Sequence, residues 1–263
     1  MEQQKFVRKN TTLFDAQQRN ERKRNRRTAF YIFLFVFISL GFLAVCVAVF
    51  LNVTEVNIIG NMKYSYEEIM EYVPITVGDN IYSFDSDKIE ENIIAAFPYI
   101  KTVEVKRDLP TTVEITITEE MPYFASELAG DTYIMSSDLK VLERLPNTKA
   151  DSVGIVTISL NNIRQCIVGK RIEFVSDRML NAVSSLYKNF ADNYIEDKIV
   201  SVNVRSRFDI YLNYDNRIEV YIGDTDDLDI KMRFLVAIID KHNENVTGTI
   251  DISNPHEASV ALS

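Results

Sequence analysis

The sequence predicts an α+β protein carried by a single N-terminal transmembrane helix. Three observations support this: a long apolar run near the N-terminus, a strand-helix-helix-strand-strand order after it, and then a series of alternating segments with two more helical patterns. We predict four parts in the chain. They are a disordered basic cytoplasmic tail (1–28), a transmembrane helix (29–51), a first domain (52–122) and a second, mixed sheet and helix domain (123–263).

The apolar run covers residues 29–51 and contains no charged residue. At roughly 1.5 Å per residue, a helix of this length crosses a hydrocarbon core about 30 Å thick. Residues 1–28 hold nine Lys or Arg against three Asp or Glu, whereas the whole chain has a net charge of −9. Because basic flanks stay in the cytoplasm, we predict a single-pass protein of the cell membrane with its N-terminus inside and its C-terminal region outside.

A cleaved signal peptide is the alternative interpretation of this run. The apolar region of a signal peptide is short, about 7 to 15 residues, and ends at a small-x-small site. Here the run is longer and ends with Phe50-Leu51-Asn52-Val53, which lacks such a site. The sequence therefore favours an uncleaved anchor.

The first domain begins with a strand and a short helix. Residues 53–59 alternate as a strand does, and Gly60-Asn61 closes the strand with turn residues. Ser65 and Glu68 have the spacing of a capping box, in which each side chain bonds the backbone amide of the other residue. We therefore predict a helix from Ser65 to about Tyr72.

A second helix and a hairpin complete the first domain. A helix is predicted over residues 86–96, because Ile89, Ile93, Ile94 and Phe97 fall at the three- and four-residue steps that line one helix face. Residues 100–106 and 111–118 alternate and are rich in β-branched residues, and their short connection predicts a hairpin. One small sheet covered by two helices is the expected result.

The second domain is predicted to be a mixed sheet with two helices. Asp215-Asn216 is typical of a tight turn between two strands. The predicted elements are hairpin strands at 133–135 and 138–142, a strand at 153–160, a helix at 174–190, strands at 199–204, 208–214 and 217–222, a helix at 228–241, and strands at 248–252 and 258–262.

Five short segments of the first domain form an ordered set of motifs. They are Val56–Asn61, Tyr64–Ile69, Pro98–Ile100, Val105–Val113 and Glu119–Pro122. In this order, just after one N-terminal span, they closely resemble the POTRA module of the FtsQ/DivIB family of bacterial cell-division proteins. The likeness continues less tightly through the second domain, which is similar to the family's β domain.

The resemblance implies a non-enzymatic scaffold of the divisome, located at the division septum. It implies binding to FtsL-like and FtsB/DivIC-like bitopic proteins, and a role in controlling septal peptidoglycan synthesis. An uncovered sheet edge can accept an added strand from such a partner. In the family the last strands bind the FtsB-like partner, and the matching positions here are Ile250, Ile252, Ser253, Asn254, Ala258, Ser259, Val260, Ala261 and Leu262.

Residues that support catalysis or metal binding are sparse. His242 and His256 are isolated, and Cys166 has no neighbouring cue for activation; with Cys46 inside the span, the exported part has no partner for a disulfide. Asp224–Asp229 lacks the Gly and Glu that a calcium loop uses, and acidic residues suit the start of a helix. We predict no catalytic residue, metal or cofactor, and no nucleic acid or small-molecule substrate.

One rival function stays open. A membrane-anchored exported enzyme or receptor acting at the cell wall would have the same anchor and the same size of exported region. Such a protein would need a pocket with convergent polar groups. The basic residues 22–27 do not favour nucleic acid, because a topology signal and contact with anionic lipid explain them.

Overall fold

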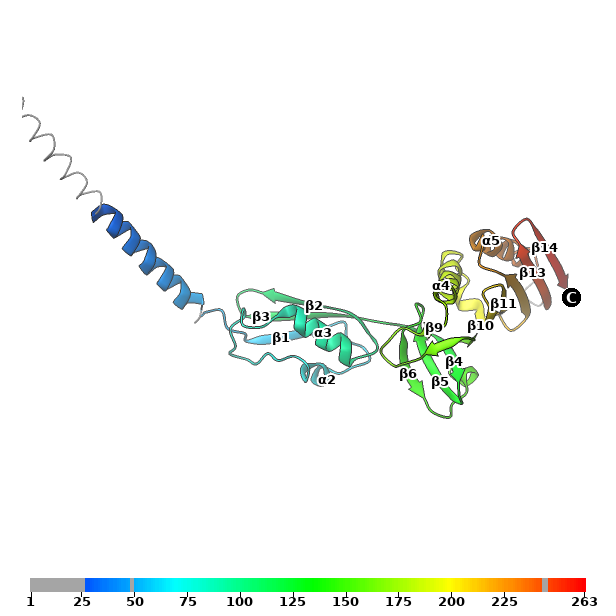
Figure 1. The fold of residues 1–263 in the computed structure, drawn as a ribbon, viewed down its shortest axis with the longest axis horizontal. Helices are drawn as coiled ribbons and strands as arrows, with labels where there is room; N and C mark the ends of the chain where they lie inside the picture. Colours follow the sequence, from blue (N-terminus) through cyan, green and yellow to red (C-terminus); the bar gives the residue numbers. More distant parts are fainter. Residues whose placement is uncertain (1–26, 48–49, 243–245) are drawn as a thin grey trace, which may run out of the picture. The chain divides into compact units, whose positions relative to one another are not determined.

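The computed structural model describes residues 27–47, 50–242 and 246–263 (Figure 1). The chain is divided into two compact units. Of the described residues, the first unit contains those up to 57 together with 75–85 and 106–114, and the second contains those of 58–74, 86–105 and 115–263. Most of the tail predicted to be disordered, residues 1–26, lies outside the described residues.

A helix runs from Arg27 to Val47 and overlaps most of the predicted transmembrane segment, 29–51. Among the described residues it is the one helix that is long and apolar enough to cross a membrane. Its 21 residues correspond to a length of about 31 Å. Residues 48–49 of the predicted span lie outside the description.

The strand-helix-helix-strand-strand order predicted after the span is confirmed. Its three strands form a sheet of order β1-β3-β2. The capping box is present: the Ser65 hydroxyl accepts from the Glu68 amide at 3.2 Å, and the Glu68 carboxylate accepts from the Ser65 amide at 2.8 Å. The elements are β1 (Glu55–Ile59), α2 (Tyr66–Met70), α3 (Ser86–Ala96), β2 (Ile100–Asp108) and β3 (Thr112–Glu119).

The second unit contains a sheet of nine strands in the order β14-β13-β12-β11-β10-β7-β4-β5-β6. Three of its pairings are parallel: β4 with β7, β7 with β10, and β12 with β13. The strands are β4 (Pro122–Leu128), β5 (Asp131–Ser136), β6 (Val141–Leu145), β7 (Val156–Leu160), β10 (Ile199–Ser206), β11 (Asp209–Tyr214), β12 (Ile218–Gly223), β13 (Gly248–Asn254) and β14 (Glu257–Leu262).

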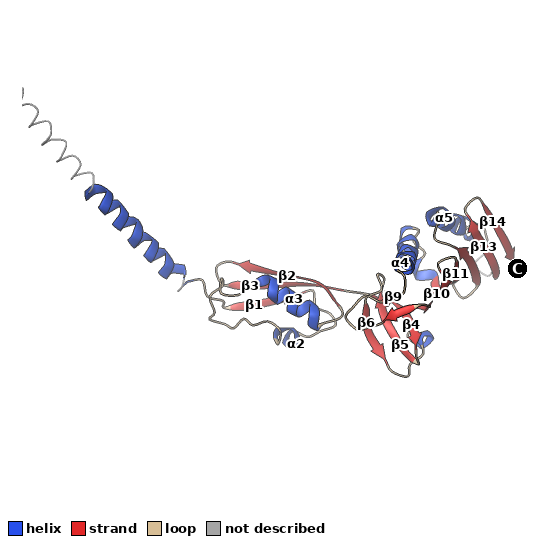
Figure 2. Cartoon of the chain, viewed as in Figure 1, coloured by secondary structure: helices blue, strands red, loops and turns tan. Residues whose placement is uncertain are grey.

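Helices α4 (Asp177–Asp192) and α5 (Leu228–Ile239) pack on one face of this sheet. Figure 2 shows both helices beside the strands β10 to β14. Their apolar side chains, such as Leu186 and Leu235, join buried strand residues such as Val220 in one core. The helix α5 carries the chain from β12 to its parallel neighbour β13, as a crossover helix does.

Several details differ from the sequence-based expectation. Strand β4 was not predicted, and the hairpin strand predicted at 138–142 is β6, Val141–Leu145. The helix predicted to start at Phe174 begins at Asp177, because Phe174 pairs with Ile163 in a small hairpin of β8 (Ile163–Gln165) and β9 (Glu173–Phe174). The strand predicted to start at residue 153 begins at Val156, because Gly154 has a φ of +81° and turns the chain just before it. Short 3-10 turns cover Ala150–Ser152 and Glu196–Lys198.

Candidate partner-binding edge

Strand β14 is the terminal strand of the nine-stranded sheet (Figure 1). It pairs antiparallel with β13, with Ile250 opposite Val260 and Asp251 opposite Ser259. Within the described part of the chain, no strand pairs with its other side. The predicted partner-binding residues therefore include a true sheet edge.

The hydrogen bonds between β13 and β14 show which backbone groups face that edge. Thr247 and Ser263 exchange both backbone bonds, with N···O distances of 3.2 and 2.9 Å. Opposite pairs alternate between bonded and non-bonded in an antiparallel ladder, so Ala261 and Ser259 also bond toward β13. The N–H and C=O groups of Val260 and Leu262 consequently point away from the sheet.

The side chains of β14 divide between two faces. Ala258 and Leu262 lie on the helix-covered face and pack against the core, and Val260 on the same face is 41 % exposed. Ser259 and Ala261 point to the opposite, uncovered face. Both faces of β14 are thus accessible to a segment docked beside it.

The other predicted residues have different surroundings. Ile250 and Ile252 are buried in the core, so their side chains support β13 and do not reach the surface. Ser253 donates its amide to Asp251 Oδ1 at 2.9 Å, and Asn254 Oδ1 accepts the His256 amide at 3.0 Å. These bonds shape the turn between β13 and β14.

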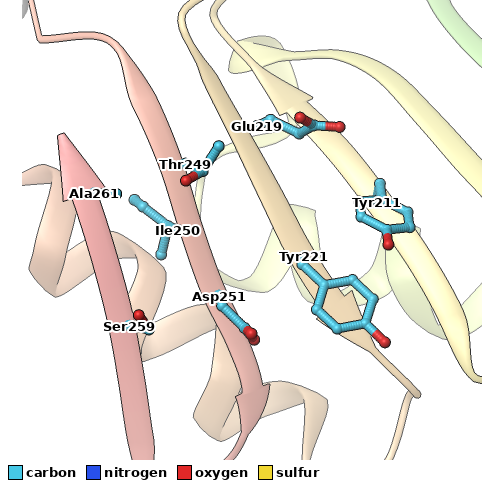
Figure 3. Close-up of a pocket in the computed structure, with 8 residues that line it drawn as sticks. All are labelled: Tyr211, Glu219, Tyr221, Thr249, Ile250, Asp251, Ser259 and Ala261. Carbon is cyan, nitrogen blue, oxygen red and sulfur yellow. The ribbon is translucent and has the colours of Figure 1, made fainter. Parts of the chain in front are cut away.

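A groove lies on the uncovered face next to β14 (Figure 3). A row of paired residues crosses four strands, from Tyr211 through Tyr221 and Asp251 to Ser259. The groove has a volume of about 270 Å³, and Glu219, Thr249, Ile250 and Ala261 complete its lining. Local sequence patterns do not reveal this groove, although polar and apolar residues alternate in these strands.

Aromatic rings form the floor of the groove. The Tyr211 and Tyr221 ring centroids are 4.8 Å apart, and the Arg205 guanidinium lies 4.8 Å from the Tyr211 ring. Partial desolvation and the nearby Asp209 carboxylate raise the pKa of Tyr211, so its hydroxyl stays protonated at neutral pH. The groove can therefore offer ring faces and hydrogen bonds, with Glu219 and Asp251 as its negative charges.

The acidic loop before α5 has a structural role. Asp224 Oδ1 accepts from the Lys231 ammonium at 2.6 Å, and the Asp224 carbonyl oxygen accepts from the same group at 3.0 Å. Lys231 is 1 % exposed, and its hydrogen bond lowers the pKa of Asp224. These hydrogen bonds connect α5 to the loop that follows β12.

The surroundings of His242 and Cys166 do not favour catalysis. His242 Nδ1 lies 2.7 Å from the Ile238 carbonyl oxygen at the end of α5. Burial raises the pKa of the Cys166 thiol to about 11, so the thiol stays protonated and unreactive at neutral pH. Within residues 27–47, 50–242 and 246–263, no group of three His, Cys, Asp or Glu is placed to hold a metal ion.

These features define a class: a chain with one candidate membrane-spanning helix, a small β-α-α-β-β domain, and a larger sheet that ends in an exposed strand. Residues 51–120 match the family described as POTRA domain, FtsQ-type. The likeness to the FtsQ/DivIB family is thereby confirmed for the domain next to the span.

Curated relatives extend the likeness over most of the chain. Cell division protein DivIB of Clostridium botulinum is 25 % identical over 238 residues, which cover 88 % of this chain and 90 % of the relative. DivIB of Clostridium tetani is 28 % identical over 193 residues (72 % and 70 %), and DivIB of Bacillus subtilis is 28 % identical over 181 residues (65 % and 64 %). The chain is thus similar to bacterial cell-division proteins.

Proposed function

We propose that this protein is a non-enzymatic scaffold of the bacterial divisome. The similarity to proteins named DivIB and FtsQ supports this function, and the helix Arg27–Val47 supports a membrane anchor. In this proposal residues 1–28 are cytoplasmic, 29–51 span the membrane, and 52–122 and 123–263 form the two exported domains. The protein acts at the division septum, where it helps to control septal peptidoglycan synthesis.

The scaffold binds FtsL-like and FtsB/DivIC-like bitopic proteins. An extended segment of the FtsB/DivIC-like partner lies beside β14 and continues the sheet. The observation that carries this proposal is the outward direction of the Val260 and Leu262 backbone groups on an edge that no described strand covers. Each new backbone hydrogen bond contributes a net stabilisation of about 1 kcal/mol.

Side chains give this edge its selectivity. Residues of an added strand alternate between the two faces. On the uncovered face they lie next to Ser259 and Ala261, whose small side chains leave the groove open toward Tyr221 and Asp251. A long side chain with a basic end fits this geometry, because it can cross β14 above Ser259 and approach the Asp251 carboxylate on β13, two strand spacings of about 4.8 Å away.

The test compares substitutions at Val260 in the full chain, held in nanodiscs together with the partners' exported regions. Val260→Pro removes one outward N–H without removing a bond to β13, and proline is tolerated on such edges. We expect partner affinity to fall about tenfold or more, since one lost backbone bond accompanies a local change of shape. Val260→Thr keeps the N–H and the β-branched shape, and we expect it to bind like the wild type.

Two results would reject this placement. Unchanged binding by a folded Val260→Pro variant would move the contact away from the outer side of β14. Unchanged binding after truncation beyond Ala258 would move it away from β14 altogether. Cleavage of purified peptidoglycan by the protein, without capture of either partner, would favour the rival function of a membrane-anchored enzyme at the cell wall.

A further inference from the structure

Three large apolar residues are exposed at one end of the first unit. Val77 and Tyr82 lie in the loop after α2, and Leu109 lies in the turn between β2 and β3. Their exposed fractions are 74 %, 55 % and 54 %. We call these three residues the apolar rim.

Hydrogen bonds hold the loop with Val77 and Tyr82 against the chain that leaves the anchor helix. The Ile81 amide donates to the Leu51 carbonyl and the Gly78 amide to the Val53 carbonyl, each at 2.8 Å. The Asn80 side chain donates to the Val47 carbonyl, the last described residue of the helix Arg27–Val47, at 3.1 Å. The loop is therefore fixed at the exit of the helix.

The turn with Leu109 is held at the same end. The Thr54 amide donates to the Thr111 carbonyl at 2.8 Å, and the hydroxyl groups of Thr54 and Thr111 are 3.0 Å apart. Arg107, near the end of β2, donates from its Nε to the Ile81 carbonyl at 2.9 Å. The loop and the turn thus form one surface around Leu51 to Thr54.

The length of the helix sets the depth of this surface in a membrane. Its 21 residues span about 31 Å, close to a hydrocarbon core of about 30 Å, so Val47 lies near the core boundary. Leu51 follows four residues later, within at most about 14 Å along the chain. Groups bonded to Leu51 and Val53 consequently lie in or beside the polar headgroup layer.

The chemistry of the surface suits that layer. Tyrosine and apolar side chains are enriched where membrane meets water, and basic groups accompany them. The Arg107 guanidinium lies 4.7 Å from the Phe84 ring and 5.9 Å from the Tyr82 ring. The carboxylates of Asp79 and Asp108 favour water, so they limit the surface to shallow insertion.

We propose that the apolar rim inserts into the headgroup and acyl-chain boundary of the membrane that the helix Arg27–Val47 crosses. Phospholipid is the occupant of this surface. The inference rests on the anchor proposed above and is independent of the partner edge at β14. Insertion at Val77, Tyr82 and Leu109 gives the first unit several contacts with the membrane besides the helix, and so limits its tilt.

The chain contains no tryptophan, so a single introduced tryptophan reports its own position. The experiment uses the full chain in phosphatidylcholine vesicles, with and without lipids brominated in their acyl chains. Three variants probe the rim: Val77→Trp, Tyr82→Trp and Leu109→Trp. Phe37→Trp, in the middle of the helix, is the control for the anchor, and Phe208→Trp, 55 % exposed in the second unit, is the control for solvent.

We expect bromine to reduce the emission at positions 77, 82 and 109 about twofold, with stronger quenching at 37 and none at 208, because quenching needs contact with the acyl region. Quenching at position 37 with none at the rim would overturn the inference and leave the anchor intact. No quenching at any position would overturn both. Equal quenching at 208 and at the rim would also overturn it, because the rim would then not be distinguished from other exposed sites.

Discussion

The two strands that neighbour β13 differ in their direction and in the burial of their side chains. β12 runs parallel to it, and its residues Val220 and Ile222 are fully buried. β14 runs antiparallel to it, and the most central residue of that strand, Val260, is 41 % exposed. The buried strand β12 contributes side chains to the core, whereas β14, on the other side of β13, leaves one of its own edges unpaired among the described residues.

The connections of the two neighbours differ as well. β12 leads through Asp224 into α5, where the buried Lys231 holds the loop by two hydrogen bonds. β14 follows β13 directly through a short turn, with no helix between them. If this comparison is correct, substitutions on the β12 side act on folding and substitutions on the β14 side act on local pairing and binding.

The largest expected effect is the loss of core packing in β12. Ile222→Ala removes three buried carbons from a position with 0 % exposure. We expect the free energy of unfolding to fall by about 3 kcal/mol, as is typical of buried large-to-small substitutions. Urea unfolding of residues 52–263, without the helix Arg27–Val47, measures this change.

The matched substitution in β14 is Val260→Ala. It removes apolar carbons from a half-exposed side chain at the sheet edge, so we expect a change of less than about 0.5 kcal/mol. Equal losses for Ile222→Ala and Val260→Ala would contradict the comparison. Such a result would mean that β14 is as important for folding as β12.

A smaller loss of stability than for Ile222→Ala is expected when the ion pair between Asp224 and Lys231 is broken. Asp224→Asn removes the negative charge that faces the buried ammonium, while the Asp224 backbone carbonyl remains as an acceptor. The Asp224 side chain is 36 % exposed, so solvent weakens the pair, and we expect a loss of about 1 kcal/mol at pH 7. Asp226→Asn changes the same charge on an exposed neighbour and is expected to have almost no effect.

The pH dependence of this pair gives a second measurement. The bond to Lys231 lowers the pKa of Asp224 below its value in the unfolded chain. The carboxylate therefore contributes stability above a pH of about 4, and this stability is lost as the pH falls through the lowered pKa. The difference in unfolding free energy between wild type and Asp224→Asn should shrink below pH 4, and a constant difference would reject the assigned ion pair.

Much of the fold follows from local patterns. The helix Ser86–Ala96 has the bounds that its apolar spacing predicts, and Ser65 and Glu68 form the predicted capping box. Strand β4 was missed because it starts at Pro122 and has three buried residues in succession, Phe124 to Ser126. A strand covered on both faces does not alternate, so its pattern is weak.

The candidate site was only partly predictable, because it depends on which strands become neighbours. The segment with β14 was identified through the family resemblance, and no local pattern shows that this strand ends the sheet. The groove needs Tyr211, Tyr221 and Asp251 in one row, although some thirty residues separate the two last positions. Pairing over such distances along the chain is decided by tertiary packing.

A mainly local effect is expected for Gly248→Ala at the start of β13. Gly248 has a φ of +144°, and an added Cβ would lie 2.1 Å from the Ala261 carbonyl oxygen and 3.0 Å from the Leu262 Cα. The clash is with the backbone of β14, so that strand must move away. We expect a loss of about 1 kcal/mol in overall stability, because the strand at the edge opens as a separate local unit.

Amide hydrogen exchange of the full chain distinguishes this local effect from global unfolding. In the wild type the amides of Ser259 and Ala261 should be protected, and those of Val260 and Leu262 should exchange fast, because only the first pair bonds to β13. Gly248→Ala should speed exchange at Ser259 and Ala261 by about tenfold or more while β12 stays protected. Gly130→Ala is the control, because Gly130 also has a positive φ, +87°, but faces open space. Faster exchange along β12 as well would show that the two neighbours of β13 unfold together, and the contrast between a structural and a binding strand would then be wrong.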